Sequence, residues 1–178
     1  MRGARHGSTA CMSCSINNPP DFMAVGVTAQ DTTPFEAPVQ FAAVDGFELT
    51  GTFFWGPCEI ASRHAALINC GGGISATRYH NFARYLATAG LPVLTYDYRG
   101  IGASRPARLR KFAANVYDWS EYDCAGAISW LRARCPEAEL VGIAHSVGAL
   151  LFGGAVSATE LSRFLFICAH TGDRKSVV

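Results

Sequence analysis

Charged side chains are scarce in this sequence. Asp, Glu, Lys and Arg make up only 16% of its 178 residues, against about 25% in an average domain. The balance of 15 basic and 14 acidic residues leaves a net charge of +1, so neither a nucleic acid nor an acidic membrane surface is expected as a partner. A hydrophobic share of 49% excludes disorder for most of the chain. Such a composition favours one domain with a buried, mostly parallel sheet covered by helices on both faces.

Long apolar runs and paired cysteines are also missing. The most apolar stretch, Leu140–Val156, contains a histidine and a serine and is shorter than a membrane span. No apolar segment of the signal-peptide type precedes Asn17, so a reducing cytoplasm is the expected location. The seven cysteines are odd in number and widely spread, which does not fit a disulfide framework. Cys11 and Cys14 form a C-x-x-C pair without partners at zinc spacing, so no metal or cofactor is expected.

From Val39 onward the sequence alternates between strand and helix patterns. Apolar residues alternate on both sides of the turn pair Asp45-Gly46, which predicts a hairpin of two antiparallel strands. Four more strands are predicted at 65–69, 92–96, 139–144 and 164–168. Helices are predicted between them at 79–87, at 118–135 with Asp118 and Glu121 as a capping box, and at 147–158. This order predicts an α/β fold with right-handed crossovers.

The segment around Ser146 carries the strongest functional signal. Ser146 lies where a predicted strand meets a predicted helix. The residues two positions before and after it, Ala144 and Gly148, are small. This context is typical of a nucleophile elbow, in which a tight and strained turn leaves room only for small neighbours. The following helix start offers free N–H groups and a positive dipole end to a developing oxyanion. The adjacent His145 is expected to pack and to form hydrogen bonds, because its side chain points away from its neighbour's.

Two further motifs precede this serine, each at the end of a predicted strand. They are the glycine turn Cys70–Gly73 and the pattern D-x-R-G-x-G-x-S at 97–104. Together with A-H-S-x-G at 144–148, in this order, they make the chain from about Val39 to His170 resemble the α/β-hydrolase superfamily. The closest resemblance is to its monoglyceride-lipase-like and serine-aminopeptidase-like branch. The resemblance implies an α/β-hydrolase fold.

The resemblance also implies roles for particular residues. Ser146 would be the nucleophile, and the backbone N–H groups of Gly72 and Val147 would form the oxyanion hole. Apart from the resemblance, Gly71 and Gly73 are candidate substrate-binding residues, because glycines in this turn let backbone N–H groups face a ligand. His170 is a further candidate, because it lies at the C-terminal end of a predicted strand, where ligands collect in open α/β sheets. Asp97 and Arg99 would fix their loop by charge-assisted hydrogen bonds. Cys70, beside the presumed oxyanion hole, is read as a buried cysteine in preference to a reactive thiol. The implied reaction is acyl transfer from a small-molecule ester or amide to Ser146, followed by hydrolysis with water.

In that family the triad acid and base follow later strands, whereas only 32 residues follow Ser146 here. We therefore expect a C-terminally truncated hydrolase whose last strands are missing, with no triad acid, base or substrate preference assignable. Residues 36–172 are expected to be the hydrolase part. Residues 1–35 are expected to be a flexible tail, with 1–22 spurious if Met23 is the true start. Residues 173–178 are expected to be an artefact, because their codons can be read as a sequencing adapter.

Several alternatives stay open at this stage. An inactive fragment, or an acyltransferase or binding protein on the same fold, fits the same motifs. Dehalogenase chemistry is disfavoured because the residue at the elbow is serine, not aspartate. The sequence does not indicate an oligomeric state. If the last strands are missing, the strand at 164–168 is expected to be an exposed apolar edge that favours aggregation.

Overall fold

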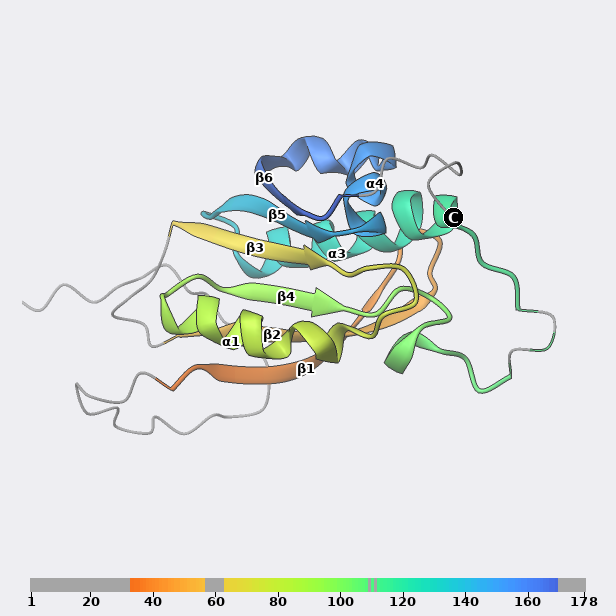
Figure 1. Ribbon diagram of the computed structural model, residues 1–178, viewed down its shortest axis with the longest axis horizontal. Helices are drawn as coiled ribbons and strands as arrows, with labels where there is room; N and C mark the ends of the chain where they lie inside the picture. Colours follow the sequence, from red (N-terminus) through yellow and green to blue (C-terminus); the bar gives the residue numbers. More distant parts are fainter. Residues whose placement is uncertain (1–32, 57–62, 109, 111, 170–178) are drawn as a thin grey trace, which may run out of the picture.

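One twisted sheet organises the chain in the computed structural model, which describes residues 33–56, 63–108, 110 and 112–169. Within these residues six strands lie in the order β1-β2-β4-β3-β5-β6, seen from bottom to top in Figure 1. The strands are β1 (Phe35–Ala42), β2 (Glu48–Trp55), β3 (His64–Asn69), β4 (Val93–Tyr96), β5 (Glu139–His145) and β6 (Leu161–Ile167). β1 and β2 are antiparallel to their neighbours, and β4, β3, β5 and β6 are parallel. The predicted α/β class with a mostly parallel sheet is confirmed.

Helices cover both faces of the sheet. They are η2 (Ala76–Tyr79), α1 (His80–Thr88), η3 (Gly102–Ser104), α2 (Val116–Asp118), the π-helix η4 (Trp119–Cys124), α3 (Ala125–Arg134), α4 (Val147–Gly154) and η5 (Val156–Glu160). Helix α1 packs on one face, where Ala83 and Ala87 join a small core with Ile68. Helices α3 and α4 pack on the other face, as Figure 1 shows for α3. None of the helices in the described segments is long and apolar enough to cross a membrane.

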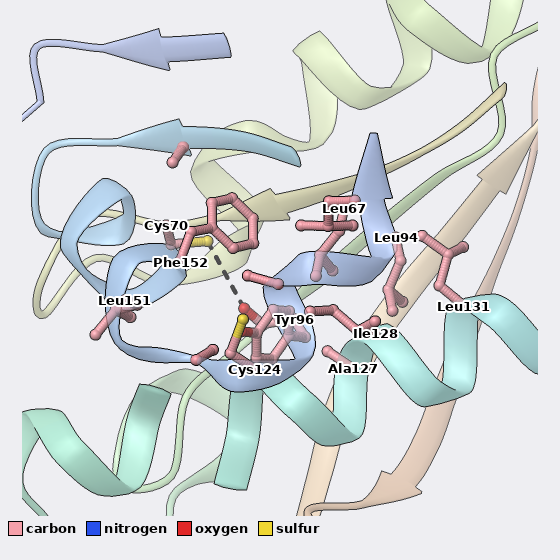
Figure 2. Close-up of a cluster of buried hydrophobic side chains, with 14 of the residues drawn as sticks. Leu67, Cys70, Leu94, Tyr96, Cys124, Ala127, Ile128, Leu131, Leu151 and Phe152 are labelled. Carbon is pink, nitrogen blue, oxygen red and sulfur yellow. Dashed lines mark hydrogen bonds between the residues drawn. The ribbon is translucent and has the colours of Figure 1, made fainter. Parts of the chain in front are cut away.

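The larger core lies between the sheet and helices α3 and α4. Figure 2 shows Leu67 and Leu94 of the sheet in one cluster with Ile128 and Leu131 of α3 and Leu151 of α4, and all five side chains are fully buried. Burial of each such side chain contributes about 1.5–3 kcal/mol of hydrophobic free energy. Strand β3 is buried over Ala65–Asn69, as expected for a central parallel strand covered on both faces. This core fixes the carboxyl ends of β3, β4 and β5 relative to one another.

The second long helical segment begins earlier than its sequence predicts. The predicted capping box, Asp118 with Glu121, is wrong: Asn115 is the N-cap, and Asp118, three residues later, is its N3 partner. The Asn115 side chain accepts from the Asp118 N–H at 3.1 Å, and the Asp118 carboxylate accepts from the Asn115 N–H at 2.9 Å. Either residue type makes a good N-cap, so the pattern alone did not separate the two starts.

The last helix and strand also differ from their predicted bounds. Helix α4 ends at Gly154 instead of near Ala158, because two consecutive glycines weaken the helix before Ala155 turns to an extended conformation. Strand β6 begins at Leu161, three residues before the prediction. It ends at Ile167, since the next residue, Cys168, has a left-handed φ of 48° that interrupts a strand.

Strand β6 is an edge strand. Among the described residues it pairs only with β5, and four consecutive apolar side chains are 40–51% exposed: Phe164, Leu165, Phe166 and Ile167. The ring of Phe164 packs edge-on against Phe152 of α4, with 5.4 Å between centroids. The predicted apolar edge strand is therefore confirmed.

Candidate functional site

Ser146 occupies the junction between β5 and α4 in an unusual backbone conformation. Its φ is 52° and its ψ is −119°, and it is one of two non-glycine residues with a left-handed φ in the described part of the chain. Such a conformation costs about 1–3 kcal/mol and persists only where the surroundings hold it. Here the Ser146 N–H donates to the carbonyl of Ile167 at 3.0 Å, and its carbonyl accepts from the N–H of Ala149 at 3.2 Å. Strand β6 and helix α4 together keep the strained turn.

The glycine turn after β3 lies next to this junction. The Gly71 carbonyl accepts from the Ile74 N–H at 3.1 Å, which closes the turn around Gly72. A Cβ atom built on Gly72 would lie 3.4 Å from Cγ1 of Val147, so the two residues predicted to share a site are neighbours. No hydrogen bond among the described residues uses the N–H of Gly72 or of Val147. Val147 opens α4, and the first N–H groups of a helix have no intrahelical acceptor.

The hydroxyl of Tyr79 links the same two segments. It accepts a hydrogen bond from the Gly71 N–H at 2.9 Å and lies 2.8 Å from Nδ1 of His145. His145 thus packs and forms a hydrogen bond, as predicted. Burial raises the pKa of Tyr79, although the Gly71 N–H partly opposes this, so the hydroxyl keeps its proton at neutral pH. Tyr79 has no role in the predicted site, because its position matches only the apolar face of a helix. No local pattern indicates partners 8 and 66 residues away.

The loop after β4 is fixed by buried carboxylates. The Asp97 side chain accepts from the N–H of Ala76 at 2.7 Å and from that of Ala103 at 2.8 Å. Gly102 is required there, because a Cβ atom would overlap the Asp97 carboxylate and φ is +47°. These bonds hold the start of η2, and therefore Tyr79, at the carboxyl edge of the sheet.

Arg99 continues this anchoring toward the helices. Its Nε donates to Asp123 at 2.7 Å, and its two terminal nitrogens donate to Asp45, also at 2.7 Å. Burial raises the pKa of Asp123, whereas the hydrogen bonds from Arg99 lower that of Asp45. Although burial opposes it, the two carboxylates raise the pKa of Arg99, which stays charged. Asp97 and Arg99 are thus structural residues, as predicted.

A buried polar network lies beneath the junction. Oδ1 of Asn69 accepts from the Tyr96 hydroxyl at 2.8 Å, and Nδ2 donates to the Gly148 carbonyl at 3.3 Å. Figure 2 shows the neighbouring contact of 3.7 Å between the Cys70 thiol and the Tyr96 carbonyl. Burial strongly raises the pKa of Cys70, so this thiol stays protonated and unreactive. Cys70 is therefore a buried structural cysteine, which was the preferred prediction.

An open apolar depression of about 570 Å³ lies beside His145. Its lining consists of Ile74, Arg78, Tyr79, Phe82, His145 and Ile167. Gly71 and Gly73 lie in the turn that leads to Ile74, whereas His170 lies outside the described residues. Nowhere in the described ranges do three or more His, Cys, Asp or Glu side chains gather as metal ligands.

The sheet order and the junction at Ser146 define an α/β-hydrolase fold. Residues 61–164 match the family described as Serine aminopeptidase, S33. Because this match covers more than half of the chain, the protein belongs to that family. A search of curated protein sequences finds no significant match.

Solved structures of α/β-hydrolases share the fold. An esterase from Pyrococcus furiosus superposes with a TM-score of 0.61 at 22% identity, over 80% of this chain and 53% of its own. The peroxisomal α/β-hydrolase Lpx1 from Saccharomyces cerevisiae gives 0.64 at 18% identity, over 83% and 48%. A serine hydrolase without a lid from Xanthomonas campestris gives 0.57 at 21% identity, over 74% and 60%. The chain thus spans about half the length of the first two and three fifths of the third.

Proposed function

We propose that this protein is a serine hydrolase that forms an acyl-enzyme at Ser146 from a small-molecule ester or amide. The observation that carries the proposal is the strained Ser146 backbone at the start of α4, where Val147 contacts Gly72 and neither N–H group has an acceptor among the described residues. Strain of about 1–3 kcal/mol at a strand-to-helix turn is a feature that packing alone does not require. The solved esterase from Pyrococcus furiosus, which shares the fold, supports an ester as the substrate class.

The proposed reaction follows from these positions. Oγ of Ser146 attacks the acyl carbon, and the C=O π electrons move to oxygen to give a tetrahedral oxyanion. The N–H groups of Gly72 and Val147 donate to that oxygen, and the amino end of α4 adds its positive dipole. Collapse of the oxyanion expels the alcohol or amine with a proton, and water then releases the acid by the same route.

A general base must take the Ser146 proton. His145 does not serve, because its Nδ1 lies 2.8 Å from the Tyr79 hydroxyl and its backbone directly precedes the nucleophile. His64 begins β3, at the opposite end of the sheet from Ser146, and the His80 ring packs edge-on against Phe54 of β2, with 5.0 Å between centroids. We therefore assign neither base nor acid among the described residues. Gly71, Gly73 and His170 are proposed to line the substrate pocket, and the cytoplasm is the proposed location.

Trapping the acyl-enzyme tests this function. The full chain is mixed with p-nitrophenyl acetate, quenched in acid and mapped by peptide mass spectrometry, with Ser146→Ala as the control. We expect one acetyl group on Ser146 and release of nitrophenol that the S146A variant does not show. Acetylation confined to lysines, or equal nitrophenol release by both proteins, would contradict the proposal.

A further inference from the structure

One hydroxyl connects the two halves of the candidate oxyanion site. Tyr79 follows Ala76, which the Asp97 carboxylate anchors, so its ring is placed by the loop after β4. Its oxygen contacts the glycine turn at the Gly71 N–H and the serine junction at His145. Gly72 directly follows Gly71, and Val147 lies two residues after His145, so the two N–H groups belong to residues that are 75 positions apart in the sequence. The Tyr79 hydroxyl is therefore a direct cross-link between the two segments.

The Tyr79 hydroxyl has one proton to donate, and its oxygen already accepts from the Gly71 N–H. His145 Nδ1 lies 2.8 Å from this oxygen, within reach of that proton. Donation to Nδ1 corresponds to a neutral imidazole with its proton on Nε2, and it continues the chain in one direction from Gly71 to His145. The approach is close: a Cβ atom on Gly71 would lie 3.0 Å from that Nδ1 and 3.4 Å from the hydroxyl oxygen. Glycine at 71 is what allows the three groups to meet.

We propose that Tyr79 and His145 are positioning residues that hold the glycine turn against the serine junction. Through the chain Gly71 N–H to Tyr79 hydroxyl to His145 Nδ1, they set the direction of the Gly72 N–H relative to the Val147 N–H. Neither side chain touches the reacting atoms. The effect on catalysis rests on the proposed function, whereas the hydrogen-bond chain itself does not.

Tyr79→Phe removes only the hydroxyl and tests the chain directly. Long-range ¹H–¹⁵N correlation spectra should show His145 as the Nε2–H tautomer in the wild type and a loss of that preference in Y79F. Hydrogen exchange at the Gly71 amide should become at least about tenfold faster. Labelling of Ser146 by a fluorophosphonate should slow by about tenfold to hundredfold, because small misplacements of catalytic groups have effects of this size.

Tyr85→Phe is the matched control. Tyr85 lies on helix α1, which begins directly after Tyr79, and is 70% exposed, so its variant should leave all three measurements unchanged. A second pair of variants, at His145, tests the same hydrogen-bond chain if Y79F folds poorly. His145→Asn retains an acceptor near the Nδ1 position and should label at close to the wild-type rate, whereas His145→Ala should not.

The outcomes separate the two proposals. A wild-type His145 with its proton on Nδ1, or unchanged Gly71 exchange in Y79F, would overturn the positioning role. Equal labelling by wild type, Y79F and H145A would overturn it as well. If the wild type does not label at Ser146 at all, the proposed function fails, and the tautomer and exchange measurements still decide the hydrogen-bond chain.

Discussion

The carbonyl oxygen of Asn69 lies 2.6 Å from the point that a Cβ atom on Gly148 would occupy. The end of β3 and the first turn of α4 therefore touch through their backbones, with the Cys70 carbonyl 2.8 Å from the same point. This contact places the glycine turn beside Ser146. It explains why the motif needs a small residue two positions after the serine.

Gly148→Ala should consequently displace the start of α4. We expect a loss of about 1–3 kcal/mol in the free energy of unfolding, measured in urea, because the new methyl group has no room. Gly153→Ala is the control in the same helix. No atom lies within 4 Å of its Cβ position, so it should be neutral or stabilise by up to about 1 kcal/mol. Equal effects of the two variants would contradict the close-contact explanation.

The two carboxylates that pair with Arg99, those of Asp123 and Asp45, should differ in their contribution to the free energy of unfolding. Asp123 is fully buried, whereas the Asp45 side chain is 33% exposed. Asp123→Ala leaves part of a buried guanidinium unpaired and should cost about 3–5 kcal/mol. Asp45→Ala should cost less, because water replaces its hydrogen bonds. Urea unfolding of both variants checks this order, and a larger loss for D45A would show it to be wrong.

The lowered pKa of Asp45 should also make the free energy of unfolding depend on pH. Hydrogen bonds from Arg99 lower its pKa in the folded state, so its contribution is complete above the unfolded value of about 4 and is lost as the pH falls through the lowered folded value. Asp123 has a raised pKa and opposes this trend, so the comparison with Asp45→Asn isolates Asp45. We expect D45N to lose less stability than the wild type between about pH 6 and pH 3. Identical acid profiles of the two proteins would rule this out.

Thiol reactivity should follow burial. Cys70 and Cys124 are buried, and burial raises the pKa of both thiols, to about 11 in Cys124. Cys168 is exposed. Iodoacetamide labelling mapped by mass spectrometry should therefore modify Cys168 more than about a hundredfold faster than the other two, which react only after opening. Rapid labelling of Cys70 in the folded protein would contradict this expectation and support a reactive thiol at that position.

The apolar edge strand should drive self-association. Leu165 is 51% exposed on β6, and a lysine there places a charge on a sheet edge that otherwise invites pairing. Leu165→Lys should reduce light scattering and shift the protein toward the monomer. Tyr85→Lys, a change at an exposed position of α1, should have no such effect. A wild-type chain that is monomeric and unfolds cooperatively would contradict the prediction.

The sequence predicted the order of strands and helices because their apolar periods are local. It also placed the glycine turn, the D-x-R-G loop and the serine junction at the right strand ends. The N-cap was predicted at Asp118 and lies at Asn115, because both residues are followed three positions later by an acidic side chain. The π-helix that follows was not predicted.

Hydrogen bonds between side chains that are distant in the sequence could not be predicted. Tyr79 reads as an ordinary apolar-face residue until the fold brings its hydroxyl to Gly71 and His145. The contact between Asn69 and Tyr96 likewise joins neighbouring strand ends that are 27 residues apart. Neither contact has a local periodicity or spacing by which it could be recognised.

The most direct measurement of the central claim is site-mapped fluorophosphonate labelling of the full chain. The strained Ser146 backbone, with the N–H groups of Gly72 and Val147 beside it, predicts one covalent adduct on Ser146 and none in Ser146→Ala. Loss of labelling in Gly148→Ala, with retention in Gly153→Ala, would connect the reactivity to the junction's geometry. A folded wild-type chain that shows no adduct, or an adduct on another residue that persists in S146A, would contradict Ser146 as the nucleophile.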